Sequence, residues 1–103
     1  MIWLSFDPQA GHEQAGRRPA VVLSPSLYNG SAALAIVVPI TAHAKGYPFE
    51  VVIPAGLDIT GVVLADHIKS VDWLARRAEY CCTLPPQVVR EVLTKAALLV
   101  TAG

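Results

Sequence analysis

The chain has 103 residues and a formal net charge of zero, because eight Lys and Arg residues balance eight Asp and Glu residues. This balance excludes the globally basic surface of many nucleic-acid-binding proteins, so any contact with phosphate groups has to come from a local patch. The length predicts one domain over residues 1–103, and the apolar fraction of 53% predicts a substantial hydrophobic core. Homo-oligomerisation is the simplest way to cover the apolar surface that so small a domain leaves outside its core.

The amino-terminal sequence and the cysteines indicate a cytoplasmic protein. Met1 leads directly into Ile-Trp-Leu, without the basic start or the cleavage site of a signal peptide. The longest apolar runs fall far short of the ~20 residues that a membrane-spanning helix needs, so we expect no membrane partner. Cys81 and Cys82 are adjacent, and adjacent cysteines form a disulfide only with strained geometry and lack the spacing of a zinc site. We therefore expect free, reduced thiols and no metal ligands.

Short apolar runs predict three strands in the first half of the chain, at residues 2–6, 20–24 and 32–40. The Asn29-Gly30 pair predicts a turn between the second and the third of them. The third run is apolar at every position except Pro39, which predicts that both faces of this strand are covered.

A polar loop at residues 11–19 separates the first two predicted strands and gathers His12, Glu13, Arg17 and Arg18. These groups stand out because only 16% of the chain is charged. The proline that follows Arg18 biases its backbone towards an extended conformation, so the arginine belongs to the start of a strand. A fixed scaffold that presents an acid, a titratable base and two cations together favours a functional site over a solvated connector.

The second half of the chain predicts further strands and one helix. Residues 41–48 form another polar loop, which is followed by strands at 49–53, 62–65 and 68–71. Apolar residues recur at helical spacing through residues 85–100, which predicts an amphipathic helix with its apolar side in the core. Short strands followed by one C-terminal helix indicate a mainly β fold, a small and strongly bent antiparallel sheet or barrel with the helix packed against it.

Four segments of the chain resemble the MazF/PemK toxin family, in the same order and at similar spacing. They are Gly-His-Glu-Gln-Ala-Gly-Arg-Arg-Pro-Ala-Val-Val-Leu-Ser (11–24), Val-Pro-Ile-Thr (38–41), Lys-Gly-Tyr-Pro-Phe-Glu-Val (45–51) and Leu-Ala-Asp-His-Ile-Lys-Ser-Val-Asp-Trp (64–73). The resemblance covers nearly the whole chain and is far more specific than one short motif. His12 stands where many members carry Ser, and His67 where many carry Gln.

This resemblance implies an SH3-like β-barrel with a C-terminal helix, the fold of MazF-type and CcdB-type plasmid maintenance toxins, assembled as a homodimer. It also implies the toxin of a type II toxin–antitoxin system, a metal-independent and sequence-specific endoribonuclease (mRNA interferase) without cofactors. The substrate is then single-stranded RNA, either mRNA or rRNA, cut by 2′-OH attack to leave 2′,3′-cyclic phosphate and 5′-OH ends. The implied partner is a MazE-like antitoxin whose acidic tail fills the RNA groove, and operator DNA is contacted only through that complex.

The resemblance implies catalytic roles for Arg18, Thr41 and Glu13. A guanidinium suits the charge of the pentacovalent phosphorane because it stays protonated and makes paired hydrogen bonds with phosphate. The alternative for Arg18 is a surface ion pair with Glu13. Thr41 donates its hydroxyl to a non-bridging oxygen, or else it satisfies local backbone in a turn. Glu13 accepts the 2′-OH proton or orients Arg18, and His12 or His43 acts as the proton donor.

Candidate RNA contacts flank this proposed centre, and they are His12, Arg17, His43, Lys45 and Tyr47. Lys and Arg side chains hold phosphates, whereas the Tyr47 ring either stacks on an unpaired base or only anchors its loop. Arg76 and Arg77 are expected in a solvated turn, with a phosphate contact as the alternative. Asp66 and Lys69 are expected at the edge of the barrel or of the dimer rather than in the cleft.

Two other functions fit the same fold, because fold alone does not decide function. One is a non-catalytic toxin that inhibits DNA gyrase, which has no need for a phosphate-cleaving set such as Glu13, Arg18 and Thr41. The other is a small RNA-binding barrel, which binds RNA in a salt-dependent manner and leaves it intact. Discrete cuts in a long single-stranded RNA, made in the presence of a chelator, distinguish the endoribonuclease from both.

Overall fold

An antiparallel sheet of seven strands dominates the computed structural model, which describes residues 1–5 and 17–101. The strands are β1 (Ile2–Ser5), β2 (Arg17–Val22), β3 (Ala35–Thr41), β4 (Glu50–Val52), β5 (Val62–Leu64), β6 (Lys69–Val71) and β7 (Glu79–Tyr80). The helices are α1 (Ser26–Ala32) and α2 (Pro86–Thr101). The predicted mainly β fold with a C-terminal helix is therefore confirmed.

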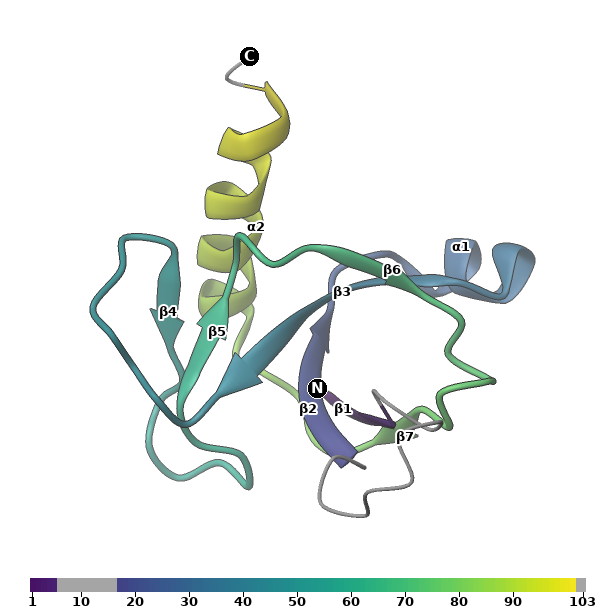
Figure 1. The fold of residues 1–103 in the computed structure, drawn as a ribbon, viewed down its shortest axis with the longest axis horizontal. Helices are drawn as coiled ribbons and strands as arrows, with labels where there is room; N and C mark the ends of the chain where they lie inside the picture. Colours follow the sequence, from purple (N-terminus) through teal and green to yellow (C-terminus); the bar gives the residue numbers. More distant parts are fainter. Residues whose placement is uncertain (6–16, 102–103) are drawn as a thin grey trace.

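Strand β3 organises the sheet. The strand order is β4-β5-β3-β2-β1-β7, and β6 pairs with the first residues of β3 while β5 pairs with its last two. Figure 1 shows β3 running from the part of the molecule that contains α1, β6 and β7 to the part that contains β4, β5 and α2. Within the described residues no pairing joins the end strands β4 and β7, so the sheet is strongly bent but is not a closed barrel.

Both faces of β3 are covered, as its uninterrupted apolar run predicts. Val38 and Ile40 belong to one buried cluster, which also contains side chains of β4, β5 and α2. Ala35 and Val37 belong to a second cluster, together with Leu4 of β1. Successive side chains of a strand point to opposite faces, so this one strand supplies both clusters.

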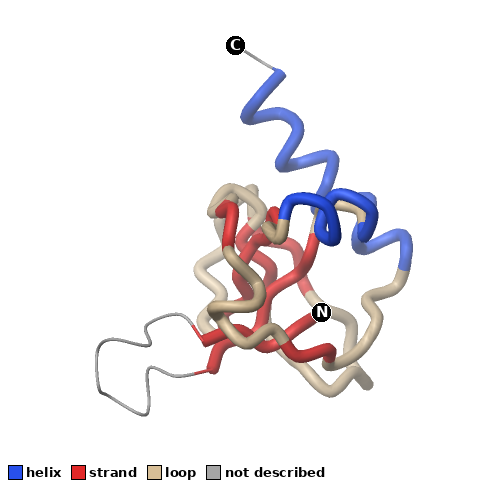
Figure 2. Tube along the Cα trace, turned by 90° about the vertical axis from the view of Figure 1, so that its right-hand side faces the viewer, coloured by secondary structure: helices blue, strands red, loops and turns tan. Residues whose placement is uncertain are grey.

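Helix α2 buries one side chain per turn, Val88, Val92 and Ala96, at the spacing predicted from the sequence. Val88 and Val92 pack in the cluster that contains Val38. The C-terminal end of the helix stands clear of the sheet (Figures 1 and 2), and Val100 is 75% exposed. Neither helix of the described residues has the length and the apolar character needed to span a bilayer.

Residues 26–32 form helix α1 rather than the predicted Asn-Gly turn. The Asn29 carbonyl accepts hydrogen bonds from the Ala33 N–H at 3.1 Å and from the Trp73 Nε1–H at 3.0 Å, and the Ser24 hydroxyl donates to the Asn29 side chain at 2.6 Å. Trp73 is 44 residues away, so tertiary contacts override the local turn preference. Strand β7 was also missed, because its two residues gain their partner only through long-range pairing with β1.

Candidate active site

Arg18 and Thr41 stand at opposing positions on neighbouring strands. The register of β2 and β3 places Ala20 opposite Pro39, and two residues further along both strands lead to Arg18 and Thr41. Both residues also line the same two cavities. The structure therefore brings together the guanidinium and the hydroxyl that the sequence predicts to act on one phosphate.

We name the two cavities after one residue that is particular to each. The Lys69 cavity has a volume of about 640 Å³ and is lined by Arg18, Pro39, Ile40, Thr41, Leu64, His67, Lys69, Ser70, Val71 and Arg76. The His43 cavity has a volume of about 430 Å³ and is lined by Trp3, Arg18, Pro19, Ile40, Thr41, Ala42, His43, Asp58, Ile59 and Thr60. Arg18, Ile40 and Thr41 line both, so the candidate catalytic pair lies where the two cavities meet.

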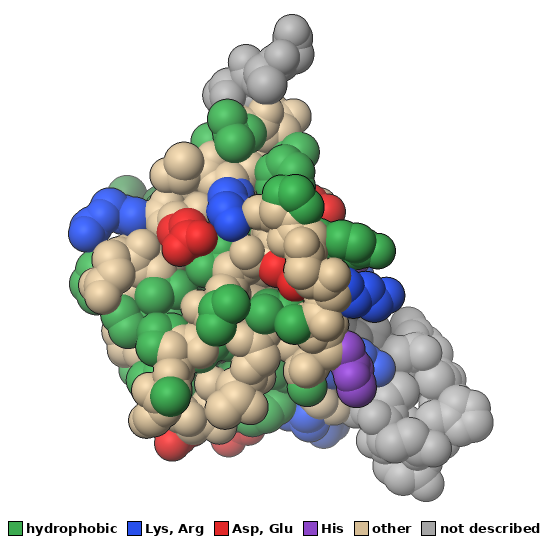
Figure 3. All heavy atoms as spheres, turned by 90° about the vertical axis from the view of Figure 1, so that its left-hand side faces the viewer, with side chains coloured by type: hydrophobic (Ala, Val, Ile, Leu, Met, Phe, Trp, Pro, Cys, Tyr) green, Lys and Arg blue, Asp and Glu red, His purple; other side chains and the backbone are tan. Residues whose placement is uncertain are grey.

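The ionisable side chains that line the Lys69 cavity, within the described part of the chain, are all basic: Arg18, His67, Lys69 and Arg76. They supply the local positive patch that a chain of zero net charge needs to contact phosphate. Figure 3 shows histidine and Lys or Arg side chains gathered along one edge of the molecule. The concentration of cations in one concave surface favours a polyanionic ligand.

The sequence interpretation was wrong to place Lys69 at an outer edge, because Lys69 lines the cleft. Arg76 lies in the predicted turn, but it also lines the cleft and its Nη1 donates to the Ser5 carbonyl at 3.2 Å, so it is not simply solvated, whereas Arg77 of the same turn is exposed. Strand β6 brings Lys69 there by pairing it with Val37 of β3. The only local signal was the alternation of His67 and Lys69 with apolar residues, which is typical of one polar strand face.

The Thr41 hydroxyl is held by the loop that follows it. Its Oγ1 accepts a hydrogen bond from the His43 N–H at 3.2 Å. A hydroxyl can accept this bond and still donate its own proton, so the turn role and the catalytic role are compatible. Gly61, with φ of 122°, packs so closely on the Thr41 carbonyl that a Cβ at that position would collide with it. Backbone contacts on both sides therefore fix Thr41.

Glu50 shapes the loop that carries the other candidate RNA contacts. Its carboxylate accepts the Lys45 N–H at 3.0 Å and the Gly46 N–H at 3.0 Å, and its carbonyl accepts the Lys95 Nζ of α2 at 3.1 Å. The sequence interpretation gave Glu50 no role, although Glu50 lies within one of the four matching segments. His43 lines the cavity named after it, whereas the Lys45 and Tyr47 side chains lie exposed on the same loop. These three positions remain candidate contacts.

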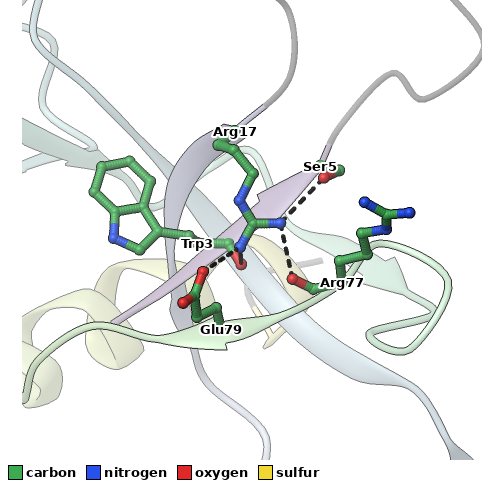
Figure 4. A network of polar contacts seen from close by, with 5 residues as sticks. All are labelled: Trp3, Ser5, Arg17, Arg77 and Glu79. Carbon is green, nitrogen blue, oxygen red and sulfur yellow. Dashed lines mark hydrogen bonds and ion pairs between the residues drawn. The ribbon is translucent and has the colours of Figure 1, made fainter.

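Arg17 uses its guanidinium within the chain, as Figure 4 shows. Nη1 donates to the Arg77 carbonyl at 2.8 Å and to the Ser5 hydroxyl at 3.1 Å, and Nη2 donates to the Glu79 carboxylate at 3.1 Å and to the Trp3 carbonyl at 3.4 Å. Adjacent residues of a strand point to opposite faces, so Arg17 and Arg18 serve different surfaces. Arg17 joins β1, β2 and β7, while Arg18 faces the cavities.

Two predicted site residues, His12 and Glu13, lie outside the described residues. Their roles as RNA contact and as proton acceptor or orienting group therefore stay predictions. The described part of the site contains Arg18 and Thr41 with the cations beside them.

Comparison with known protein families gives one match over most of the chain. The family described as "PemK-like, MazF-like toxin of type II toxin-antitoxin system" matches residues 1–100. The endoribonuclease toxin MazF of Escherichia coli (strain K12) is 47% identical over 100 residues, which cover 97% of this chain and 89% of that protein. The endoribonuclease PemK of Escherichia coli is 36% identical over 105 residues, covering 97% of this chain and 79% of that protein.

Solved structures from Deinococcus radiodurans share the fold. A crystal structure of MazF superposes with a TM-score of 0.86 at 56% identity and covers 96% of this chain and 90% of that one. A crystal structure of a MazE–MazF complex gives a TM-score of 0.87 at 49% identity and covers 97% of this chain and 89% of that one.

Proposed function

The chain belongs to the family of PemK-like, MazF-like toxins of type II toxin–antitoxin systems, and from this membership we propose that it is a sequence-specific endoribonuclease acting on single-stranded RNA. The observation that carries the proposal is the position of Arg18 and Thr41 at the junction of two cavities, one of which gathers Lys69, Arg76 and His67. Relatives that are 47% and 36% identical are named endoribonucleases. A gyrase inhibitor would have no use for this arrangement.

We propose that cleavage proceeds by attack of the 2′-OH on the adjacent phosphorus, with departure of the 5′-oxygen. Arg18 hydrogen-bonds the equatorial oxygens of the phosphorane, where negative charge develops, and Thr41 donates to a non-bridging oxygen. Glu13 accepts the 2′-OH proton or orients Arg18, and His12 or His43 returns a proton to the leaving oxygen. The products are a 2′,3′-cyclic phosphate and a 5′-OH end, and this route uses no cofactor.

The two cavities suit the nucleotides on either side of the scissile phosphate. Lys69 and Arg76 lie where they can hold a flanking phosphate, and the Lys69 cavity of about 640 Å³ has room for a base beside them. On the other side, His43 lines the second cavity, with Lys45 and Tyr47 on the same loop for a phosphate and a stacked base. Arg17 acts as a structural anchor rather than as an RNA contact, because its guanidinium is engaged in the network of Figure 4.

Incubation of the protein with a long single-stranded transcript in excess chelator tests the proposed activity. We expect cuts at discrete positions. The new 5′-OH ends should accept label directly from polynucleotide kinase, and the new 3′ ends should resist extension by poly(A) polymerase until the cyclic phosphate is removed. Mapping the cuts also gives the recognition sequence. An RNA that is bound but stays intact would favour the RNA-binding barrel, and an RNA that is neither bound nor cut would favour the gyrase inhibitor.

The proposed partner is a MazE-like antitoxin, because solved relatives of this chain are MazE–MazF complexes. A groove lined by cations suits an acidic tail as well as it suits RNA, so one surface serves both ligands. We propose that operator DNA is reached only through that complex. The cytoplasmic location fits an RNA substrate and stays a prediction.

We also propose that a second copy of the chain covers the apolar surface of α2. Leu23, Tyr28, Ile36, Ile68, Leu93 and Val100 are among the residues that line a groove of about 550 Å³. Leu93→Glu should therefore convert the homodimer into a monomer in light-scattering measurements, since a buried unpaired carboxylate opposes association. Val52→Glu is the matched control, because Val52 is exposed on the edge strand β4. A Leu93→Glu protein that keeps the dimeric mass would contradict this interface.

A further inference from the structure

Three side chains with metal-binding atoms meet at Asp58, which lines the His43 cavity. Asp58 lies in the loop between β4 and β5, and Cys81 and Cys82 directly follow β7. One carboxylate oxygen and the two sulfurs all lie within 4.8 Å of one another, and the two sulfurs are 3.3 Å apart. Asp58 is exposed and both cysteines are half-buried, so a solvent ion can reach all three.

The spacing of these atoms is close to that of a tetrahedral zinc site. Zinc–sulfur bonds of ~2.3 Å and zinc–oxygen bonds of ~2.1 Å place neighbouring ligand atoms roughly 3.5–3.8 Å apart. The sulfurs at 3.3 Å have to separate slightly, and the carboxylate has to move inward by about an ångström or less. The exposed side of Asp58 leaves the fourth position to water. Softness of the thiolates favours zinc over magnesium or calcium.

The geometry favours a bound cation over a disulfide at this position. A disulfide between adjacent cysteines is strained, whereas a cation can bind both sulfurs without a bond between them and can add the Asp58 carboxylate as a third ligand.

We propose that Asp58, Cys81 and Cys82 form a binding site for a thiophilic divalent cation, with zinc as the best match. This reverses the expectation from the sequence, which considered only the adjacent cysteines and could not place Asp58 beside them. Asp58 lines the His43 cavity, but the proposed cleavage step uses none of the three ligands, and the existence of the metal site does not depend on the endoribonuclease function.

Bound zinc would join three parts of the fold. The Met1 carbonyl accepts the Cys81 N–H at 3.0 Å, and the Met1 ammonium donates to the Cys82 carbonyl at 2.6 Å, so the cysteines already anchor the start of β1. Asp58, with Ile59 and Thr60 after it, lines the His43 cavity. A metal at this point therefore ties that cavity wall to the ends of β1 and β7 and stabilises the folded chain.

Cobalt(II) and zinc titrations of the reduced, chelator-stripped full chain test the proposal. We expect one equivalent of cobalt to produce a thiolate-to-cobalt charge-transfer band that zinc abolishes. Zinc at ~100 times its Kd should raise Tm by roughly 10 °C. Asp58→Asn should weaken zinc binding by at least about 10-fold, which is the loss seen even when only a partner of a ligand is removed.

Asp66→Asn is the matched control, since Asp66 is another exposed aspartate and contacts His67 rather than a thiol. It should leave the affinity for zinc unchanged. Circular dichroism checks that Asp58→Asn is folded, and we expect a wild-type spectrum because the side chain is exposed. A wild-type chain without a charge-transfer band, or an Asp58→Asn chain with wild-type affinity, would overturn the three-ligand site. RNA cleavage is not the readout, so failure of this site and failure of the proposed function are distinguishable.

Discussion

Replacement of Arg18 by alanine should reduce the single-turnover rate of RNA cleavage by about 10²–10³-fold, the loss that follows removal of one oxyanion donor from an enzyme. The reason is that Arg18 lines both cavities beside Thr41, where the phosphorane charge would develop. Binding of RNA should change little, because Lys69 and Arg76 still face the same cavity. Arg18→Lys should recover only part of the rate, since an ammonium keeps the charge but loses the paired hydrogen bonds.

Arg17→Ala is the control for this prediction, because it removes the same side chain one position away. Arg17 bonds two carbonyls, a hydroxyl and the 73% exposed Glu79. The exposed ion pair contributes little to stability, but the hydrogen bonds to backbone carbonyls join three strands. We therefore expect the free energy of unfolding to fall by about 1 kcal/mol and Tm to fall by roughly 5 °C. Cleavage should stay within the wild-type order of magnitude. Near-wild-type cleavage by Arg18→Ala, with loss of cleavage in Arg17→Ala, would reverse the assignment.

Gly61→Ala should destabilise the chain by on the order of 3 kcal/mol and lower the cleavage rate as well. Its φ of 122° disfavours any side chain, and a Cβ there would meet the Thr41 carbonyl oxygen and lie 2.9 Å from the Thr41 carbonyl carbon. The Thr41 backbone cannot move away easily, because Thr41 pairs with Val62 of β5. The strain therefore falls on the residue whose hydroxyl is proposed to contact the phosphate.

Variants of two other glycines separate the cost of backbone strain from the cost of the contact with Thr41. Gly56 has φ of 95° but nothing within 4 Å of a built Cβ, so Gly56→Ala reports the cost of backbone strain alone. Gly30 lies in α1 with open space around it, so Gly30→Ala should stabilise the chain by about 0.5–1 kcal/mol. Urea denaturation measures all three. Equal destabilisation by Gly61→Ala and Gly56→Ala would show that the contact with Thr41 adds nothing.

The sequence predicted the parts of the fold that local patterns encode. The apolar run of β3, the periodic apolar face of α2 and the proline after Arg18 each have a direct structural counterpart. Helix α1 could not be predicted in this way, because an Asn-Gly pair is typical of a turn. The hydrogen bond from Trp73 to the Asn29 carbonyl, which supports the helix, is a long-range contact. The extent of barrel closure was also not predictable, since it depends on which strands find a partner after the sheet bends.

The candidate site was predictable only where the family resemblance assigns a role to a residue. It assigns roles to Arg18 and Thr41, but none to Lys69, although Lys69 also lies in a matching segment. Lys69 and Arg76 reach the same cavity through the pairing of β6 with β3 and through the turn after it, which are long-range features. The different surfaces of Arg17 and Arg18 follow from strand alternation and could have been predicted, had the start of β2 been placed at Arg17.

The clustering of cations in the Lys69 cavity has a consequence for selectivity among polyanions. Arg18, Lys69 and Arg76 are the permanently charged groups that line this cavity in the described residues. With Lys45 of the neighbouring loop, about four counterions leave the RNA on docking, so the logarithmic salt slope is only roughly −3. Duplex DNA and folded RNA, which are held by long basic surfaces, gain little from so short a charged strip. The cavity should therefore favour flexible single strands over duplex DNA and folded RNA because of their shape, before any contact with a base contributes to binding.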